Sequence, residues 1–170
     1  MVDLFLLCGK PGCGKTTVSK FMQEKCKMIG FSADDFMLKL FGEVEDREEF
    51  ERKLALCKDL IYSITEKLLH KGIKVVLDFG FWTQKEREAV KSRFKNFDCL
   101  FIYIDKKDED IFANIEKRNA NLKDNEYYMD RVTYEVLASK FETPNEAEKV
   151  LAINNTNEED VLPLIYSLLE

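Results

Sequence analysis

The sequence has little of several features that mark particular classes of protein. Its 170 residues include only three prolines, and no linker, repeat or low-complexity stretch interrupts them. The five cysteines form no C-x-x-C pair, and their odd number does not suit a disulfide framework. No apolar run approaches membrane-spanning length, and residues 1–8 are too short for a signal peptide. We therefore expect one domain, residues 1–170, in the reducing cytoplasm and without a membrane partner.

A basic tail is also missing from the chain. The formal net charge of −6 is spread along the sequence, which counts against a nucleic-acid binder that works by bulk attraction. A local basic patch stays open as an alternative, because five cations fall between Lys85 and Lys95. That run has a helical pattern and includes two glutamates, so we expect a solvated helix face.

Apolar, β-rich runs alternate with helical patterns along the chain. The runs are residues 4–8, 28–31, 74–77, 99–104 and 150–153. Alternation of this kind predicts an α/β fold with a parallel sheet covered by helices on both faces. The polar stretch from Arg118 to Arg131 is the one long, weakly apolar interruption, and we expect it to be a mobile lid.

The stretch GKPGCGKTT follows the first apolar run and leads into a helical pattern. It matches G-x-x-x-x-G-K-[ST], a P-loop whose backbone N–H groups wrap phosphates while its lysine reaches the outer ones. The glycines allow close approach of the main chain, and the helix that follows aims its positive end at the anion. We read the thiol of Cys13 as incidental. The predicted nucleotide-binding residues are Gly9, Pro11, Gly12, Cys13, Gly14, Lys15, Thr16 and Thr17.

Acidic residues follow two of the predicted strands, at the sheet edge where ligands bind in open parallel sheets. Asp34 and Asp35 follow the second strand, and Asp78 ends the third. Asp78 is in the position of a Walker B carboxylate, so we expect it to hold Mg²⁺ together with the hydroxyl of Thr16. Asp34 is a candidate base for an attacking hydroxyl, but an N-cap role explains it equally well.

Other side chains near the same edge are candidates for substrate contacts. Phe79, Phe81 and Trp82 come within four residues of Asp78 and could wall a pocket, although packing in the core is an equally simple explanation. Arg87 and Asp35 are further pocket candidates. Arg118 opens the predicted lid and is a candidate for neutralising charge on a transferring phosphoryl group, with a surface position near a helix end as the alternative.

Taken together, the stretches GKPGCGKTT, SADDFM, VVLDFGFWTQKERE, EKRNAN and FETP resemble small bacterial P-loop kinases of the AAA-family ATP-binding type. This group is related to polynucleotide kinase, zeta toxin and chloramphenicol phosphotransferase. The resemblance implies a three-layer, nucleoside-kinase-like P-loop NTPase fold with a five-stranded parallel sheet and a short helical lid. It also implies Asp34 as base and Arg118 as a lid residue on the phosphates. The chain departs from polynucleotide kinases at Met37, where an arginine would hold the acceptor's phosphate.

These observations predict an enzyme that uses ATP and Mg²⁺ to phosphorylate a hydroxyl of a small-molecule acceptor, with Lys15, Asp34 and Arg118 as catalytic residues. Two alternatives stay open. One is a polynucleotide 5′-hydroxyl kinase, which the net charge and Met37 disfavour. The other is an ATP-binding switch with slow hydrolysis and no acceptor; its GTPase version is weakened because NNTN, residues 154–157, lacks the Lys and Asp of N-K-x-D.

Overall fold

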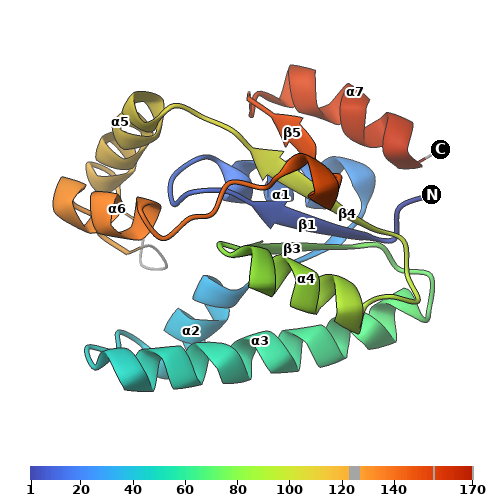
Figure 1. Ribbon diagram of the computed structural model, residues 1–170, viewed down its shortest axis with the longest axis horizontal. Coiled ribbons are helices and arrows are strands. Elements are labelled where there is room, and N and C mark those ends of the chain that lie inside the picture. The colour runs from blue at the N-terminus through green and yellow to red at the C-terminus, as the bar shows by residue number, and fades with distance from the viewer. Residues whose placement is uncertain (123–126, 155, 170) are drawn as a thin grey trace.

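A computed structural model, which describes residues 1–122, 127–154 and 156–169, has an α/β architecture (Figure 1). Five parallel strands form one sheet in the order β2-β3-β1-β4-β5. The predicted five-stranded parallel sheet is thus confirmed: two strands have the predicted bounds, and the ends of the other three are shifted by at most three residues. The strands are β1 (Leu4–Cys8), β2 (Ile29–Ser32), β3 (Val75–Gly80), β4 (Cys99–Ile104) and β5 (Leu151–Ile153).

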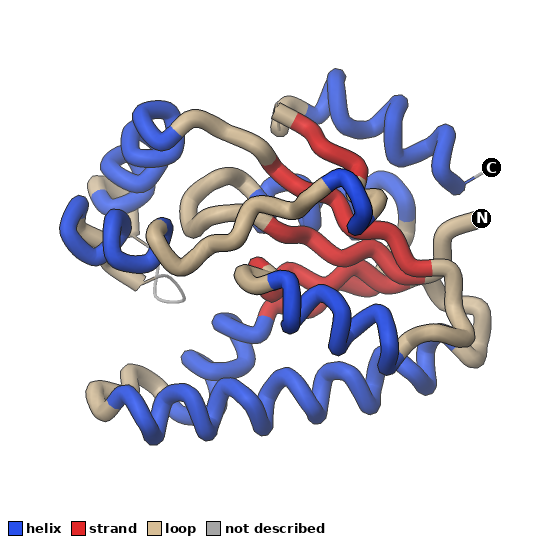
Figure 2. The backbone as a smooth tube through the Cα atoms, in the orientation of Figure 1, coloured by secondary structure: helices blue, strands red, loops and turns tan. Residues whose placement is uncertain are grey.

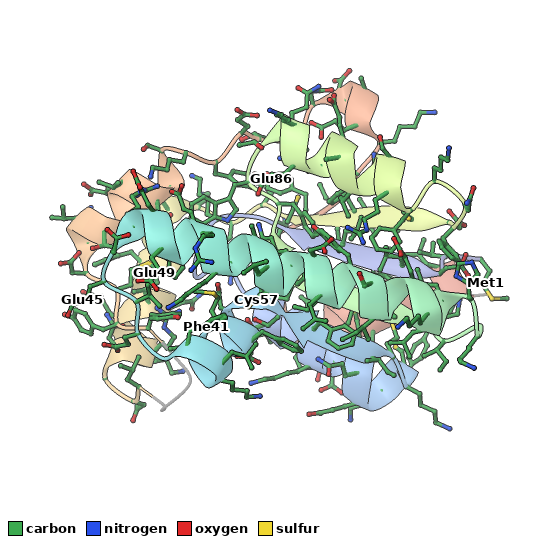
Figure 3. The ribbon with its side chains drawn as sticks, turned by 90° about the horizontal axis from the view of Figure 1, so that it is seen from below. Met1, Phe41, Glu45, Glu49, Cys57 and Glu86 are labelled. Atoms are coloured by element: carbon green, nitrogen blue, oxygen red, sulfur yellow. The ribbon has the colours of Figure 1, made fainter. Side chains whose placement is uncertain are left out.

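Helices cover both faces of this sheet and make the molecule three layers thick (Figures 1 and 3). Seven α-helices and one short 3₁₀ helix are present in the described part of the chain. The α3 and α4 helices lie on one face, and α1 and α7 lie on the other. The helices are α1 (Lys15–Cys26), α2 (Ala33–Phe41), α3 (Arg47–Leu69), α4 (Gln84–Arg93), α5 (Asp108–Asn119), α6 (Arg131–Ala138), η1 (Glu146–Glu148) and α7 (Glu158–Leu169).

The central strand β1 shows why its sequence is a continuous apolar run. All five of its side chains are fully buried, because a parallel sheet with helices on both faces has no solvated side. Leu4 and Leu6 contribute to the core under α3 and α4, whereas Phe5 and Leu7 contribute to the core under α1 and α7. Alternate residues of one strand therefore hold the two helical layers to the sheet.

The carboxyl ends of the strands meet at one edge, on the left of Figure 1. The α5 and α6 helices lie on one side of this edge and α2 lies on the other. Long connections gather here (Figure 2), including the segment between β1 and α1. None of the helices in the described ranges has the length and apolar character needed to cross a bilayer.

Candidate nucleotide-binding and catalytic site

The connection from β1 to α1 has the backbone geometry of a phosphate-binding loop. Gly12 and Gly14 have φ angles of 78° and 110°, which only glycine adopts without strain. A Cβ on Gly12 would lie 2.6 Å from Ile115, and one on Gly14 would lie 2.8 Å from Thr156. Gly14 is also the N-cap of α1 and no side chain caps that end, so the helix directs unpaired N–H groups toward the loop.

The lysine of the motif lies folded into this loop. The Lys15 Nζ atom donates hydrogen bonds to the carbonyl oxygens of Gly9 at 3.0 Å and Lys10 at 2.8 Å. The thiol of Cys13 is fully buried, with its Sγ 3.7 Å from the same Nζ. The loop therefore holds a positive charge inside the ring of backbone groups where phosphates bind in this motif.

Thr16 and Asp78 form a pair that joins the loop to the sheet. The Thr16 Oγ1 atom donates to Asp78 Oδ2 at 2.7 Å. Asp78 lies within β3, not at its end as expected, because the strand continues to Gly80. Burial raises the pKa of the Asp78 carboxyl, while Lys15 and the Thr16 hydroxyl act in the opposite direction. The pair offers two hard oxygen donors, which suits Mg²⁺ better than a transition metal.

Asp34 is not the cap of α2. Ser32 is the N-cap, and its side chain accepts a hydrogen bond from the backbone N–H of Asp35 at 3.3 Å. The capping alternative considered for Asp34 is therefore wrong, and its carboxylate in the first turn is available for another role.

The electrostatic setting of Asp34 is that of the nucleotide site. Although part of the residue is open to solvent, partial desolvation raises the pKa of its carboxyl, and the negative charge of Asp78 raises it further. The nearby ammonium groups of Lys15 and Lys58 oppose this effect. The structure thus brings Asp34, Asp78 and Lys15 into one electrostatic cluster, while their catalytic and metal-binding roles stay predictions. Asp35 contributes its negative charge to the same cluster.

The predicted lid, residues 118–131, runs from the last turn of α5 to the first residue of α6, and its residues 123–126 lie outside the described residues. The Arg118 Nη2 atom donates to the Tyr127 carbonyl oxygen at 3.2 Å, and Arg118 Nε is buried without a partner. Arg118 therefore holds the lid segment in this structure, and its contact with phosphates stays a prediction.

Arg87 is neither on a solvated face nor available to a substrate. It is 1% exposed, and its guanidinium forms two hydrogen bonds with the Glu148 carboxylate, at 2.6 and 3.0 Å. A third bond reaches the Phe81 carbonyl oxygen at 3.0 Å. The prediction of a pocket role for Arg87 is corrected here, because its donors tie α4 to η1. A local sequence pattern does not show this, since the two partners are 61 positions apart.

The aromatic residues after Asp78 divide between two environments. Phe81 is 2% exposed and belongs to the core, which corresponds to the packing interpretation. Phe79 and Trp82 are half-buried, and Phe79 packs against Phe81 and against Tyr62 of α3. The Trp82 indole covers Gly80, where a Cβ would meet it. Of these three aromatic residues, Phe79 and Trp82 therefore retain exposed surface beside the end of β3 and Phe81 does not.

Sequence reasoning missed two features near the site. Lys10, at a variable position of the motif, forms a salt bridge with Asp108 of α5 at 2.6 Å. The Tyr134 hydroxyl of α6 donates to the same Asp108 oxygen at 2.9 Å. The second feature is the Tyr127 hydroxyl, which is buried without a partner. Neither feature belongs to a sequence motif. The one signal for the contacts of Asp108 is its residue type at the start of a predicted helix, and the sequence holds no signal for the Tyr127 hydroxyl.

A hollow lies beside the loop that joins β5 to α7. Its volume is about 360 Å³. The Thr156 side chain from this loop packs on Gly14 at the start of α1, so the loop is a neighbour of the P-loop. The lining residues are Asp105, Ala152, Ile153, Asn154, Asp160 and Val161.

The parallel sheet, the phosphate loop before α1 and the Thr16–Asp78 pair together define a P-loop protein of the kinase type. Residues 4–144 match the family named AAA domain, and the chain belongs to that family. The resemblance to small P-loop kinases is confirmed.

Known proteins support the same class. The adenylate kinase of Mesomycoplasma hyopneumoniae strain 7448 is 30% identical over 121 residues, which are 66% of this chain and 57% of that protein. The chain therefore spans a little over half the length of this curated relative.

Two solved structures show a similar fold. A putative kinase from Chloroflexus aurantiacus J-10-fl has a TM-score of 0.77 at 18% identity, with 99% of this chain and 96% of that chain covered. The APS kinase of Mycobacterium tuberculosis, in complex with AMPPNP and APS, has a TM-score of 0.66 at 15% identity, with 99% and 98% covered.

Proposed function

We propose that the protein is an ATP- and Mg²⁺-dependent phosphotransferase that moves the γ-phosphate of ATP to a hydroxyl of a small molecule. The observation that carries this proposal is the position of Asp34. Ser32 caps α2 and leaves the Asp34 carboxylate available, within electrostatic reach of Lys15 and Asp78. A carboxylate near a phosphate loop, with its pKa raised above its ordinary value, suits a general base.

Each residue of the cluster has a distinct role in the proposed reaction. The loop N–H groups and Lys15 bind the β- and γ-phosphates, and Lys15 leaves its carbonyl partners when they arrive. Thr16 and Asp78 would hold Mg²⁺, which neutralises charge on the phosphates when bound. The oxygen-only donor set and the 2.7 Å contact between the two side chains fit that ion.

The transfer itself needs one proton acceptor. Asp34 takes the proton of the acceptor hydroxyl as its oxygen forms a bond to the γ-phosphorus. The bond from that phosphorus to the bridging oxygen breaks, and ADP leaves with the electron pair. We assign to Arg118 the neutralisation of charge on the transferring group, and its support is the buried Nε, a donor that has no partner in the described protein.

A polynucleotide end is the less favoured acceptor. Met37, one helical turn after Asp34, is fully buried in the core and offers no contact to a phosphate. The switch alternative lacks a use for Asp34, since a nucleotide switch needs no base for an acceptor hydroxyl. Both alternatives nevertheless predict ATP binding, so the acceptor decides between them.

The direct experiment is a screen for transfer of labelled γ-phosphate from ATP to sugars, nucleosides, antibiotics and 5′-hydroxyl oligonucleotides. We expect a small hydroxyl compound to be labelled and Lys15→Ala to abolish labelling. Asp34→Asn should keep ATP affinity and lower transfer by roughly a hundredfold or more, the range of a lost general base. Asp35→Asn is the matched control, because it changes the same group at the next position.

Three results would change the proposal. If Asp34→Asn transfers phosphate normally and Asp35→Asn does not, the general base is Asp35 and not Asp34. Efficient labelling of the oligonucleotide alone supports the polynucleotide kinase. Slow, Lys15-dependent hydrolysis with no labelled acceptor supports the switch.

A further inference from the structure

The last turn of α5 and the segment that follows it contain two buried polar atoms that have no hydrogen-bond partner in the described part of the protein. Among the described residues, three buried side-chain nitrogen or oxygen atoms lack a hydrogen-bond partner: Thr65 Oγ1, Arg118 Nε and Tyr127 Oη. Buried polar groups are almost always paired, so each exception needs an explanation. Two of the three belong to Arg118 and Tyr127 of the predicted lid, and Tyr127 is within electrostatic range of Asp34, which indicates partners that arrive with a ligand.

The position of Tyr127 is fixed by its neighbours. Arg118 Nη2 donates to the Tyr127 carbonyl oxygen at 3.2 Å. The Asn119 side chain forms two hydrogen bonds with the backbone of Met129. Its Nδ2 donates to the Met129 carbonyl oxygen at 2.6 Å, and its Oδ1 accepts from the Met129 N–H at 3.3 Å. The last turn of α5 therefore ties down the backbone on which Tyr127 stands, and Arg118 acts as its positioning residue.

The groups that face the Tyr127 phenol come from α2 and the segment after it. Burial raises the pKa of this phenol, and the negative charges of Asp34 and Glu43 raise it further. The phenol therefore keeps its proton at neutral pH and is a hydrogen-bond donor within electrostatic range of Asp34, the base of the proposed reaction.

We propose that Tyr127 binds the acceptor substrate, by donating a hydrogen bond to an oxygen next to the hydroxyl that is phosphorylated. The inference rests on the proposed function. It follows from two groups within electrostatic range of each other. Asp34 takes the proton of one acceptor oxygen, and the buried Tyr127 hydroxyl, which has no partner in the described protein, donates its hydrogen bond to a second oxygen. The acceptor class is therefore a polyol with neighbouring oxygens, such as a sugar or cyclitol, and not a simple alcohol.

Thermal unfolding of the free protein tests whether the hydroxyl is kept for a ligand. Tyr127→Phe removes an unpaired buried hydroxyl, so the variant should unfold at a higher temperature than the wild type. Tyr134→Phe is the matched control, because its hydroxyl is bonded to Asp108 at 2.9 Å, and it should unfold at a lower temperature. Tyr128→Phe changes a residue that is 67% exposed and should have no effect. A lower unfolding temperature for Tyr127→Phe would show a partner inside the protein and overturn the inference.

Transfer assays test the substrate class. The probes are D-ribose, D-glucose and myo-inositol. Each is paired with a deoxy counterpart in which one of two neighbouring hydroxyls is replaced by hydrogen. We expect the deoxy compounds to be poorer acceptors for the wild type, and Tyr127→Phe to lower kcat/KM for the full polyol by roughly tenfold, mainly through KM. The KM for ATP should change much less. In Tyr127→Phe the preference for the full polyol over its deoxy counterpart should shrink.

The two proposals fail in different ways. If no compound in the wider screen is labelled, the proposed function fails. If a compound is labelled but none of these polyols is, or if Tyr127→Phe keeps wild-type kcat/KM and preference, the inference fails while the proposed function stands.

Discussion

At the scale of single residues, the contact between Thr16 and Asp78 predicts how the enzyme uses magnesium. Thr16→Ala removes the hydroxyl that lies 2.7 Å from Asp78 Oδ2, and with it one of two oxygen donors for the ion. We expect the Mg²⁺ concentration for half-maximal rate to rise by about tenfold, the usual cost of one lost metal-site contact. The measurement is an initial-rate titration with free Mg²⁺ at saturating ATP.

Thr17→Ala is the control for this prediction. It makes the same change one position later, on an exposed side chain that forms no contact with Asp78 in the described structure. Its magnesium titration should match that of the wild type. If Thr16→Ala gives the same titration as Thr17→Ala, the hydroxyl has no part in holding the ion.

Residues of the motif were predictable from sequence because their roles depend on neighbours in the chain. Gly14, Lys15 and Thr16 act within one turn of backbone, and the fixed spacing reports that geometry directly. Tyr127 could not be found in this way. Its significance comes from an absent partner and from Asp34, a residue about ninety positions earlier, which only the folded chain brings into its surroundings.

At the scale of elements, the ion pair between Arg87 of α4 and Glu148 of η1 predicts a contribution to stability. Arg87 and Glu148 side chains are 1% and 8% exposed, so removing one partner leaves a buried charge unpaired. Glu148→Gln should lower the free energy of unfolding by about 3 kcal/mol at pH 7, as for other broken buried pairs. Glu146→Gln, an exposed change in the same η1, should have almost no effect. Denaturant unfolding gives both values.

The same pair predicts a pH dependence of stability. The hydrogen bond from Arg87 lowers the pKa of the Glu148 carboxyl below its ordinary value of 4.5. A lowered pKa means that the folded protein binds this proton less readily than the unfolded chain, so the contribution is present above pH 4.5 and is lost as pH falls through the folded pKa. The difference between wild type and Glu148→Gln should therefore shrink below about pH 4. If the difference in the free energy of unfolding between wild type and Glu148→Gln stays constant down to pH 3, the effect of the substitution comes from packing and not from the charge of Glu148.

The elements themselves followed from apolar runs, but their ends and caps did not. A run shows where a strand is buried on both faces, yet β3 continues past its apolar part through Asp78 to Gly80. Likewise, Asp34 and Ser32 are both good caps by residue type. The backbone of Ser32 is extended and that of the next residue is helical. The N-cap of α2 is therefore Ser32 and not Asp34, and residue type alone does not show this.

At the scale of the whole molecule, the charge distribution answers the question that the basic run left open. The formal net charge is −6, and α4 does not present its cations as one patch. Arg87 is buried against Glu148, Arg93 bridges Asp59 and Glu66, and the Lys91 ammonium donates to the Glu148 carbonyl oxygen at 2.6 Å. Lys85 and Lys95 remain exposed, too few for a track along a polynucleotide backbone.

This distribution predicts how phosphoryl transfer depends on salt. A protein that contacts several phosphates releases counterions, and its affinity falls roughly a thousandfold or more between low and moderate salt. A neutral small acceptor releases none, so at saturating ATP its kcat/KM should change by less than about twofold from 50 to 200 mM KCl. The measurement is transfer to the labelled small acceptor and to a 5′-hydroxyl oligonucleotide over that range. Lys95→Gln should leave both slopes unchanged. A steep loss with the oligonucleotide, starting from efficient labelling at low salt, would instead make a polynucleotide end the natural acceptor and require a cationic surface that α4 does not provide.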